Sequence, residues 1–411
     1  MASGKTKAFH WAWIILATCF VDLFINYSVR LGYGIVLPEM IRTLGFGRTA
    51  GGSIYNFYLF SYIALTPLTG YLTDRFGARR VITTCCLILS IGTLLMGTVK
   101  TLWAACLFYA VCGLGATGMW TPVITVVQRW FSTNRRGLAL GILSTGYGMG
   151  FAVMGAVFPL IVSHSSWRNA WYFLGIGALI MVGVNGILLR SDPEDSGYSA
   201  WGQKEFSPVN EIVLTSQHVK KPFSIVLKDN RFWFIGLSYL SISYSLYGIT
   251  TFMVDYARYQ IGLPLESSSF LATIHGVCQL VGVLTILPLS DTIGRKTTII
   301  ISNSFITAFL AGILFTGNSS IMLYALVGGI GIFYGVTFPI YGACAGDYFP
   351  KEVMGTIIGA WTPFYGVGAI LVHWVTGVLR DVTGVYDYAF ILNIIMAAVA
   401  VLLFFFVKNK K

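Results

Sequence analysis

The sequence predicts an all-α membrane protein with twelve transmembrane helices in two pseudo-symmetric six-helix halves. Three observations lead to this fold class. Hydrophobic residues make up 56% of the chain and charged residues only 10%, whereas a soluble protein carries about 25% charged residues. Apolar runs long enough to cross a bilayer, about 20 residues each, recur along the whole chain. Two loop motifs of the first half also return in the second half at nearly the same offset.

The apolar runs fall into two sets of six. In the first half we expect helices near residues 12–38, 51–73, 81–99, 102–128, 137–163 and 169–190. In the second half we expect them near residues 231–257, 266–290, 297–316, 320–346, 354–379 and 386–407. The first run is too long for a signal peptide, so it is expected to form the first span. The predicted organisation is an N-terminal six-helix bundle (1–190), a cytoplasmic linker (191–230) and a C-terminal six-helix bundle (231–411).

Cationic residues gather on one side of the predicted membrane. With the N-terminus placed inside, the outer loops hold only Arg42, Arg48, Lys100, Arg168, Arg258 and Arg380. Apart from Arg30, which lies within a span, the rest of the 27 Lys and Arg residues fall on the side of the termini. This asymmetry predicts a multi-pass protein of the inner or plasma membrane with both termini in the cytoplasm. The net charge of +11 then reflects topology and does not indicate a nucleic-acid partner.

The cysteines carry no sign of metal or redox chemistry. All seven lie inside apolar runs, and none forms a C-x-x-C pair. They are therefore expected to pack as small apolar side chains. The sequence also offers no nucleophile and base in a catalytic arrangement, so we expect no enzyme activity, no cofactor and no bound metal.

The internal repeat rests on two pairs of loop motifs. The segment that begins at Gly70 reads GYLTDRFGARR, and the segment that begins at Pro288 reads PLSDTIGRK. At one common offset they align Leu72 with Leu289, Asp74 with Asp291 and Gly77 with Gly294. A second pair aligns Trp130-Phe131, before Gly137 and Gly141, with Tyr348-Phe349, before Gly355 and Gly359. Parallel repeats of this kind predict a substrate site near the bilayer midplane between the two halves.

These loops resemble the signature of the major facilitator superfamily. The resemblance covers essentially the whole chain and implies the major facilitator fold, with transport by alternating access. An Asp of such a loop can meet the positive N-terminus of a helix in the other half, and the Arg residues can bond helix-end carbonyls. We therefore predict a cytoplasmic latch that forms in one state and breaks in the other, made by Asp74, Arg75, Arg79, Arg129, Asp291 and Arg295.

Two further segments resemble one branch of that superfamily. The run RWFSTNRRGLALG, which begins at Arg129, looks like the fifth-helix signature of monocarboxylate transporters. Arg30 followed by YGIVLP resembles the first helix of bacterial monocarboxylate and oxalate/formate transporter relatives. The resemblance implies a small organic anion, most simply a monocarboxylate, carried with protons. The chain departs from the pattern in the eighth helix, where Gln279 and Val283 stand at the positions of the usual Asp and Arg.

Ionisable residues at membrane depth are costly and mark candidate functional sites. Asp22, Asn26 and Arg30 recur every fourth residue and share roughly one face of the first helix. Arg30 is predicted to bind the substrate carboxylate, because a guanidinium group matches it with two parallel hydrogen bonds. The alternatives are snorkelling to the outer interface or an ion pair with Asp22 or Asp255. Asp22 is predicted to carry the proton, with a purely structural role as its alternative.

The second half offers a matching set of polar side chains. His275 and Gln279 lie one turn apart at a depth similar to that of Arg30, so both are predicted to bind substrate and His275 also to couple protons. Hydrogen-bonded packing is the alternative for His275. His373 lies nearer the outer surface and is predicted to act in gating. Together with Asn26, the residues expected to line the substrate cavity are Tyr33, Trp120, Tyr247, Tyr334, Trp361 and Tyr365.

The sequence thus predicts a monomeric secondary transporter of a small organic anion with proton symport. Its expected partners are the anion, protons and the lipid bilayer. Two alternatives stay open at this point: an anion exchanger of the oxalate/formate type, and a transporter of a neutral or zwitterionic solute, which the missing Arg of the eighth helix would suit.

Overall fold

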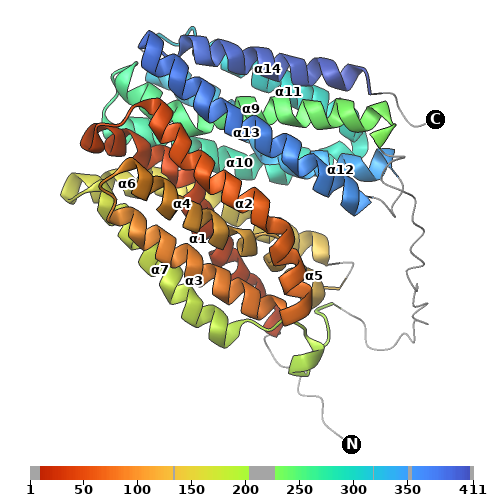
Figure 1. Ribbon diagram of the computed structural model, residues 1–411. Coiled ribbons are helices and arrows are strands. Elements are labelled where there is room, and N and C mark those ends of the chain that lie inside the picture. The colour runs from red at the N-terminus through yellow and green to blue at the C-terminus, as the bar shows by residue number, and fades with distance from the viewer. Residues whose placement is uncertain (1–9, 133–134, 203–226, 318, 350–353, 408–411) are drawn as a thin grey trace, which may run out of the picture.

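The computed structural model describes residues 10–132, 135–202, 227–317, 319–349 and 354–407, and these ranges are helical almost throughout (Figure 1). The helices of the first half are α1 (Trp11–Leu44), α2 (Arg48–Phe76), α3 (Ala78–Gly97), α4 (Leu102–Ala116), the short 3₁₀ helix η1 (Thr117–Met119), α5 (Thr121–Trp130), α6 (Arg136–His164) and α7 (Trp167–Leu188). Those of the second half are α9 (Asn230–Tyr259), α10 (Leu265–Ile293), α11 (Arg295–Ile313), α12 (Ser320–Tyr348), α13 (Met354–Thr383) and α14 (Asp387–Phe405). The predicted all-α membrane fold is confirmed.

Most of these helices can cross a membrane. Within the described ranges, 11 helices are long and apolar enough to do so when α4, η1 and α5 count as one span. The remaining long helix, α2, has 29 residues and is more polar. One face of α2 packs against α13 of the other half, where the Asn56 amide donates to the Ile370 carbonyl and the Ser53 hydroxyl accepts from Trp374, each at 3.0 Å.

The helices form two groups that meet along three pairs of neighbours. Helices α1 to α7 pack among themselves, and so do α9 to α14 (Figure 1). Between the groups, α1 contacts α9, α2 contacts α13 and α6 contacts α10. One close approach is at Gly148 of α6, where an added Cβ would lie 2.7 Å from the carbonyl oxygen of Gly276.

Two names for the ends of the molecule are used below. The terminal face is the end at which α1 begins and α14 ends, and it carries Trp11, Phe76 and Phe405. The opposite face carries the turn between Leu44 and Arg48 and the corresponding turns of the other helices.

The repeated loop motif takes the same backbone conformation in both halves. Gly77, between α2 and α3, has φ 81°, and Gly294, between α10 and α11, has φ 92°. Each glycine N–H donates to the carbonyl four residues earlier, at 3.0 Å in both cases. Only glycine adopts this conformation without strain, so these two positions fix the sharp turn that joins one span to the next.

The first part of the predicted linker packs against the terminal face of the first half. Its η2 turn (Glu194–Ser196) is followed by Trp201, whose N–H donates to the carbonyl of Trp130 at 2.9 Å. The Trp201 ring contacts those of Trp13 and Phe131, with centroids 5.0 and 5.7 Å away. Residues 191–202 therefore extend the first bundle, and the rest of the predicted linker, up to residue 226, lies outside the described residues.

Candidate functional site

Arg30 is buried at the contact between the two halves. It belongs to α1, and its side chain is among the buried groups, with the residue only 4% exposed. Its Nη2 donates to the hydroxyl of Tyr247 at 2.5 Å and to that of Tyr365 at 3.3 Å, both in the second half. The guanidinium group therefore points inward and does not snorkel to the surface.

Arg30 is surrounded by phenol groups and has no acidic partner. The rings of Tyr27, Tyr58 and Tyr62 lie 5.8, 5.9 and 5.1 Å from its Cζ. Among the described residues, Arg30 makes no ion pair. Asp255 pairs with Arg48 instead, and none of the other ion pairs includes Arg30. Its Nε has no hydrogen-bond partner. The site thus holds one buried positive charge that no protein carboxylate balances.

A row of aromatic rings joins Arg30 to His275 across the two halves. Tyr27 contacts Tyr147 with ring centroids 4.4 Å apart, and Tyr147 stacks on Tyr334 of the second half at 6.2 Å. Tyr334 in turn lies 5.1 Å from the His275 ring. The row therefore brings the predicted residues Arg30, Tyr334 and His275 into one continuous site.

His275 and Gln279 form a pair with free polar atoms. The Gln279 amide Nε2 donates to His275 Nδ1 at 2.8 Å, which leaves the proton of the neutral ring on Nε2. Neither His275 Nε2 nor Gln279 Oε1 has a partner in the described structure, and the Tyr147 hydroxyl beside them has none either. Buried polar atoms are normally satisfied, so these unpaired atoms mark the place where a polar ligand fits.

The fourth span is broken at the depth of this site. α4 ends at Ala116, and α5 starts only at Thr121, with Pro122 in its first turn. Irregular backbone at membrane depth is tolerated where it is covered by protein or faces a water-filled space. Trp120 lies at this break, with its ring 6.2 Å from that of Tyr27. The break therefore places Trp120 beside the aromatic row.

The aromatic side chains on the two sides of Arg30 differ in their exposure. Those on the terminal side of Arg30 keep part of their surface exposed: Tyr62, Trp120, Tyr239, Phe338 and Tyr365. On the other side of Arg30, the rings of Tyr55 and His373 are buried. The rings around Arg30 are thus more exposed toward the terminal face than toward the opposite face.

Two ion pairs between the halves close the opposite face. Glu39 of α1 forms an ion pair with Arg258 of α9, with its Oε1 2.6 Å from Arg258 Nη2. Arg48 of α2 donates to Asp255 at 3.1 Å, and the same carboxylate accepts from Tyr386 at 2.5 Å. Both carboxylates are almost fully buried.

A third contact caps a helix of one half with a carboxylate of the other. Asp381, in the last turn of α13, accepts the N–H groups of Arg48 and Thr49 at 2.8 Å each and the Thr49 hydroxyl at 2.7 Å. These are the first N–H groups of α2, whose own N-cap residue Gly47 has no side chain to offer. The arrangement predicted for the cytoplasmic latch, a carboxylate at a helix N-terminus of the other half, is thus present on the opposite face.

His373 lies in the same closure, just above Tyr55. Its Nδ1 meets Asn56 Oδ1 at 3.0 Å, and its Nε2 meets Thr251 Oγ1 at 2.9 Å. Its backbone carbonyl is so close to α2 that a Cβ at Gly52 would lie 2.3 Å away. His373 therefore contacts helices of both halves.

The predicted latch residues make contacts within their own half. Arg79 donates to the Gly186 carbonyl, Arg129 pairs with Asp192 at 3.0 Å, and Arg75 meets the Tyr71 hydroxyl at 3.2 Å. In the second half, Arg295 bridges Asp291 at 2.8 Å and Asp347 at 2.6 Å. The Asp74 side chain lies outside the described residues.

Between described residues, no hydrogen bond or ion pair joins the halves on the terminal side of Arg30. Among the described residues, the hydrogen bonds and ion pairs between the halves thus lie at the depth of Arg30 or toward the opposite face.

Two predicted cavity residues lie away from Arg30. Tyr33 donates to the Gly51 carbonyl at 2.6 Å and stacks on Tyr109, inside the first half. Trp361 donates to the Phe232 carbonyl at 3.0 Å, inside the second half near the terminal face. Both are packed against their own bundle, because their helices turn these positions away from the contact between halves.

The polar residues below Arg30 also remain inside the first half. Asp22 Oδ1 accepts from Asn185 Nδ2 at 2.8 Å, while its Oδ2 has no partner. Asp22 lies eight residues before Arg30, about 12 Å along the helix at 1.5 Å per residue. Asn26, one turn from each, is buried with an unpaired Oδ1.

Sequence reasoning missed several functional positions. The tyrosines at Tyr55, Tyr58 and Tyr62 of α2 recur at helical spacing, and this is the signal that could have identified a phenol-lined face. Asn185 and Asp381 carry no such signal, because their partners are more than 150 residues away in the sequence.

Comparison with known proteins identifies relatives over the whole chain. The family model described as Major Facilitator Superfamily matches residues 16–272 and 235–411. The hexuronate transporter of Bacillus subtilis is 24% identical and covers 90% of this chain and 88% of its own. A probable galactarate/D-glucarate transporter of Escherichia coli is 23% identical, with 98% and 96% covered. Monocarboxylate transporter 4 of Mus musculus is 24% identical, with 93% and 80% covered.

The fold is also that of solved transporters. A bacterial homologue of the human lysosomal transporter Spinster superposes with a TM-score of 0.74 at 15% identity, covering 98% of this chain and 97% of its own. At this identity the likeness concerns the fold alone.

Proposed function

This chain belongs to the major facilitator superfamily, and we propose that it is a secondary active transporter that moves a small organic anion by alternating access. Its relatives are transporters and not enzymes, and the three named above act on organic anions. The two six-helix bundles, 1–190 and 231–411, act as the moving halves, with the segment 191–230 as the link between them.

One observation carries the proposal: among the described residues, the buried charge of Arg30 has no carboxylate partner. Placing an unpaired cation inside a protein costs several kcal/mol unless another charge compensates it. Phenol oxygens and ring faces recover part of this cost. A substrate carboxylate recovers more, because it takes two parallel hydrogen bonds from the guanidinium group.

The charge of the site favours a monocarboxylate. Arg30 is the one cation within the aromatic row, so a single negative charge neutralises it. The remaining polar atoms, His275 Nε2, Gln279 Oε1 and the Tyr147 hydroxyl, are neutral and suit hydroxyl or carbonyl groups of the same solute. Binding of a single carboxylate therefore does not require the Arg that is missing from the eighth helix, since Arg30 alone supplies the positive charge.

The orientation follows from the placement of Lys and Arg. Among the described residues, most Lys and Arg lie at the terminal face, and by the positive-inside rule this face is cytoplasmic. The proposed cycle thus alternates between the present arrangement, closed outside by Glu39–Arg258 and Arg48–Asp255, and one closed inside by the latch loops.

Proton symport is the coupling that we propose. Asp22 is a buried carboxyl group whose partners are neutral: the Asn185 amide and, at 4.0 Å, the Cys86 thiol. A buried carboxyl group without a cation is stabilised by taking up a proton. Protonation of Asp22 would offset the charge that the substrate brings.

The test is uptake of a panel of carboxylates into proteoliposomes, with and without an imposed pH gradient. In Arg30→Gln the saturable uptake should fall by about 100-fold, because removing one partner of a buried charge pair costs 2–5 kcal/mol. Arg30→Lys should keep a fraction, because it retains the charge without the fork. Arg168→Gln is the matched control, since Arg168 bonds a carbonyl of its own half on the opposite face.

If uptake in Arg30→Gln equals that of the unaltered protein, the proposal that Arg30 binds an anionic substrate is wrong. Uptake that depends on substrate inside the vesicles and ignores the pH gradient would replace symport by exchange.

A further inference from the structure

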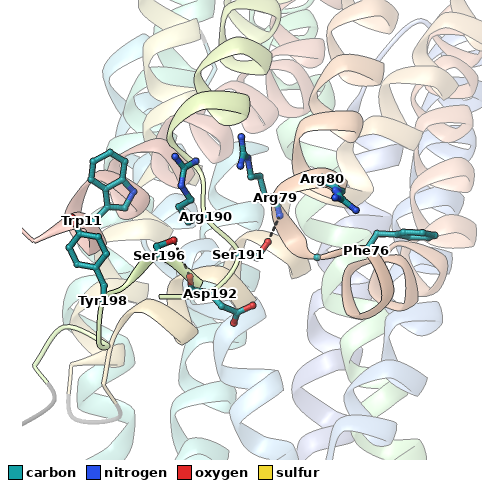
Figure 2. A pocket seen from close by; sticks show the side chains of 10 residues that line it. Trp11, Phe76, Arg79, Arg80, Arg190, Ser191, Asp192, Ser196 and Tyr198 are labelled. Atoms are coloured by element: carbon teal, nitrogen blue, oxygen red, sulfur yellow. Dashed lines mark hydrogen bonds between the residues drawn. The ribbon is translucent and has the colours of Figure 1, made fainter. Parts of the chain in front are cut away.

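A second cavity, remote from Arg30, lies at the terminal face of the first half. It has a volume of about 790 Å³ and is bordered by the start of α1, the turn between α2 and α3, and the chain after α7 (Figure 2). Its lining includes three arginines, Arg79, Arg80 and Arg190, with Trp11 and Tyr198 at one end. The proposed transport cycle does not use this cavity as a substrate site.

The cavity carries net positive charge. Asp192 is the carboxylate in its lining, and it is already paired with Arg129 at 3.0 Å. Figure 2 shows the Asp192 carboxylate pointing away from the three guanidinium groups. Among the described residues, none of these three arginines makes an ion pair.

Two of the three arginines, Arg79 and Arg190, are held in place by main-chain carbonyls at the end of α7. Arg79 donates to Gly186, and Arg190 donates to Ile187 at 2.8 Å and Leu189 at 3.0 Å. The turn that carries Arg79 is fixed in addition by Ser191, whose Oγ accepts the Arg79 N–H at 3.1 Å. These two guanidinium groups are thus positioned beforehand, although their charges remain uncompensated.

An apolar groove leads away from this cavity along the membrane-spanning surface. It has a volume of about 330 Å³ and lies between α2 and α3, over α4 (Figure 1). Apart from Arg80 and a few threonines, its lining is apolar and includes Leu65, Leu68, Leu72 and Ile88. Phe76 and Arg80 line both the groove and the basic cavity, so the two are adjacent. Leu68 and Phe76 are 49% and 48% exposed, so the groove opens toward the lipid.

We propose that this composite site binds one anionic phospholipid. Its phosphate group lies among Arg79, Arg80 and Arg190, and one acyl chain follows the groove between α2 and α3. Arginine forks match phosphate oxygens, and basic pockets between transmembrane helices on the cytoplasmic side suit anionic lipid head groups. Free phosphate would use the arginines but not the groove, and a neutral lipid would use the groove but leave the arginines unbalanced.

Native mass spectrometry of the full-length protein in detergent tests the proposal, with dioleoyl phosphatidylglycerol, dioleoyl phosphatidylcholine or inorganic phosphate added. Phosphatidylglycerol should bind as a single tight equivalent, and phosphatidylcholine at least about 10-fold more weakly. The double variant Arg80→Gln/Arg190→Gln should lose this preference. The control Lys228→Gln/Lys296→Gln removes the same charge from the terminal face of the other half and should retain it.

A second variant tests the groove independently of the charges. Thr84 lines the groove and is exposed, so Thr84→Trp fills the groove without disturbing the core. It should weaken phosphatidylglycerol binding by about 10-fold or more while every arginine remains. Each of three results would overturn the proposal. The first is equal binding of both lipids, and the second is unchanged phosphatidylglycerol binding in the Arg80→Gln/Arg190→Gln protein. The third is displacement of the lipid by inorganic phosphate to the same extent from Thr84→Trp and from the unaltered protein.

Discussion

Replacing Asp381 by alanine should open the opposite face of the protein. In the closed arrangement its carboxylate accepts three hydrogen bonds from Arg48 and Thr49 at the start of α2. When the two halves separate at this face, the carboxylate and the helix N-terminus both become hydrated. The contact therefore stabilises the closed state over the open one.

The size of the effect follows from these contacts. Loss of an N-cap costs about 1 kcal/mol, and a carboxylate at a helix N-terminus contributes up to about 1 kcal/mol more. Asp381 is exposed, so solvent screening rules out a larger value. A sum of about 2 kcal/mol corresponds to a shift of roughly 30-fold in the ratio of open to closed molecules.

Cysteine labelling measures this ratio. Val254 is fully buried on α9, one turn from Arg258, so Val254→Cys reports on opening at this face in a chain without its seven native cysteines. Asp381→Ala should raise the labelling rate by a membrane-impermeant maleimide at least about 10-fold.

Asp387→Ala is the matched control for this experiment. Asp387 is also a carboxylate near the opposite face, but its bond, from Gln260 at 2.7 Å, stays within the second half. Its removal should leave the labelling rate unchanged. The reasoning fails if Asp381→Ala labels like the unaltered chain, or if both variants rise together.

Three further substitutions test other parts of the structure. Gly52→Val should also raise the labelling rate at the opposite face, because its Cβ would lie 2.3 Å from the His373 carbonyl oxygen. Gly183→Val is the control: a Cβ at Gly183 has no neighbour within 4 Å, so this variant should label like the unaltered chain. Asp22→Asn should abolish acceleration of uptake by a pH gradient, and an unchanged proton stoichiometry would exclude Asp22 as the carrier. Tyr247→Phe removes one hydrogen bond to the central arginine and should raise KM by about 10-fold at most, since one such bond contributes about 1 kcal/mol; a loss as complete as that in Arg30→Gln would contradict this ranking.

The sequence alone determined the spans and the turns between them. A segment of about 20 apolar residues can satisfy its backbone inside a bilayer only as a helix, so composition and run length suffice to place it. The repeat also aligned Gly77 with Gly294, and in the structure both take the positive φ that only glycine tolerates without strain. The sequence also marked Arg30 and His275 as costly residues at membrane depth.

Only the tertiary structure decided which side chains meet. Tyr33 and Tyr365 are both tyrosines in apolar helices, yet Tyr33 packs within its own bundle and Tyr365 reaches Arg30. The difference arises from the rotation of each helix about its axis and from contacts between segments hundreds of residues apart, which no local pattern records. Asp381 at the start of α2 is the clearest case, since neither the acid nor the helix end indicates its partner.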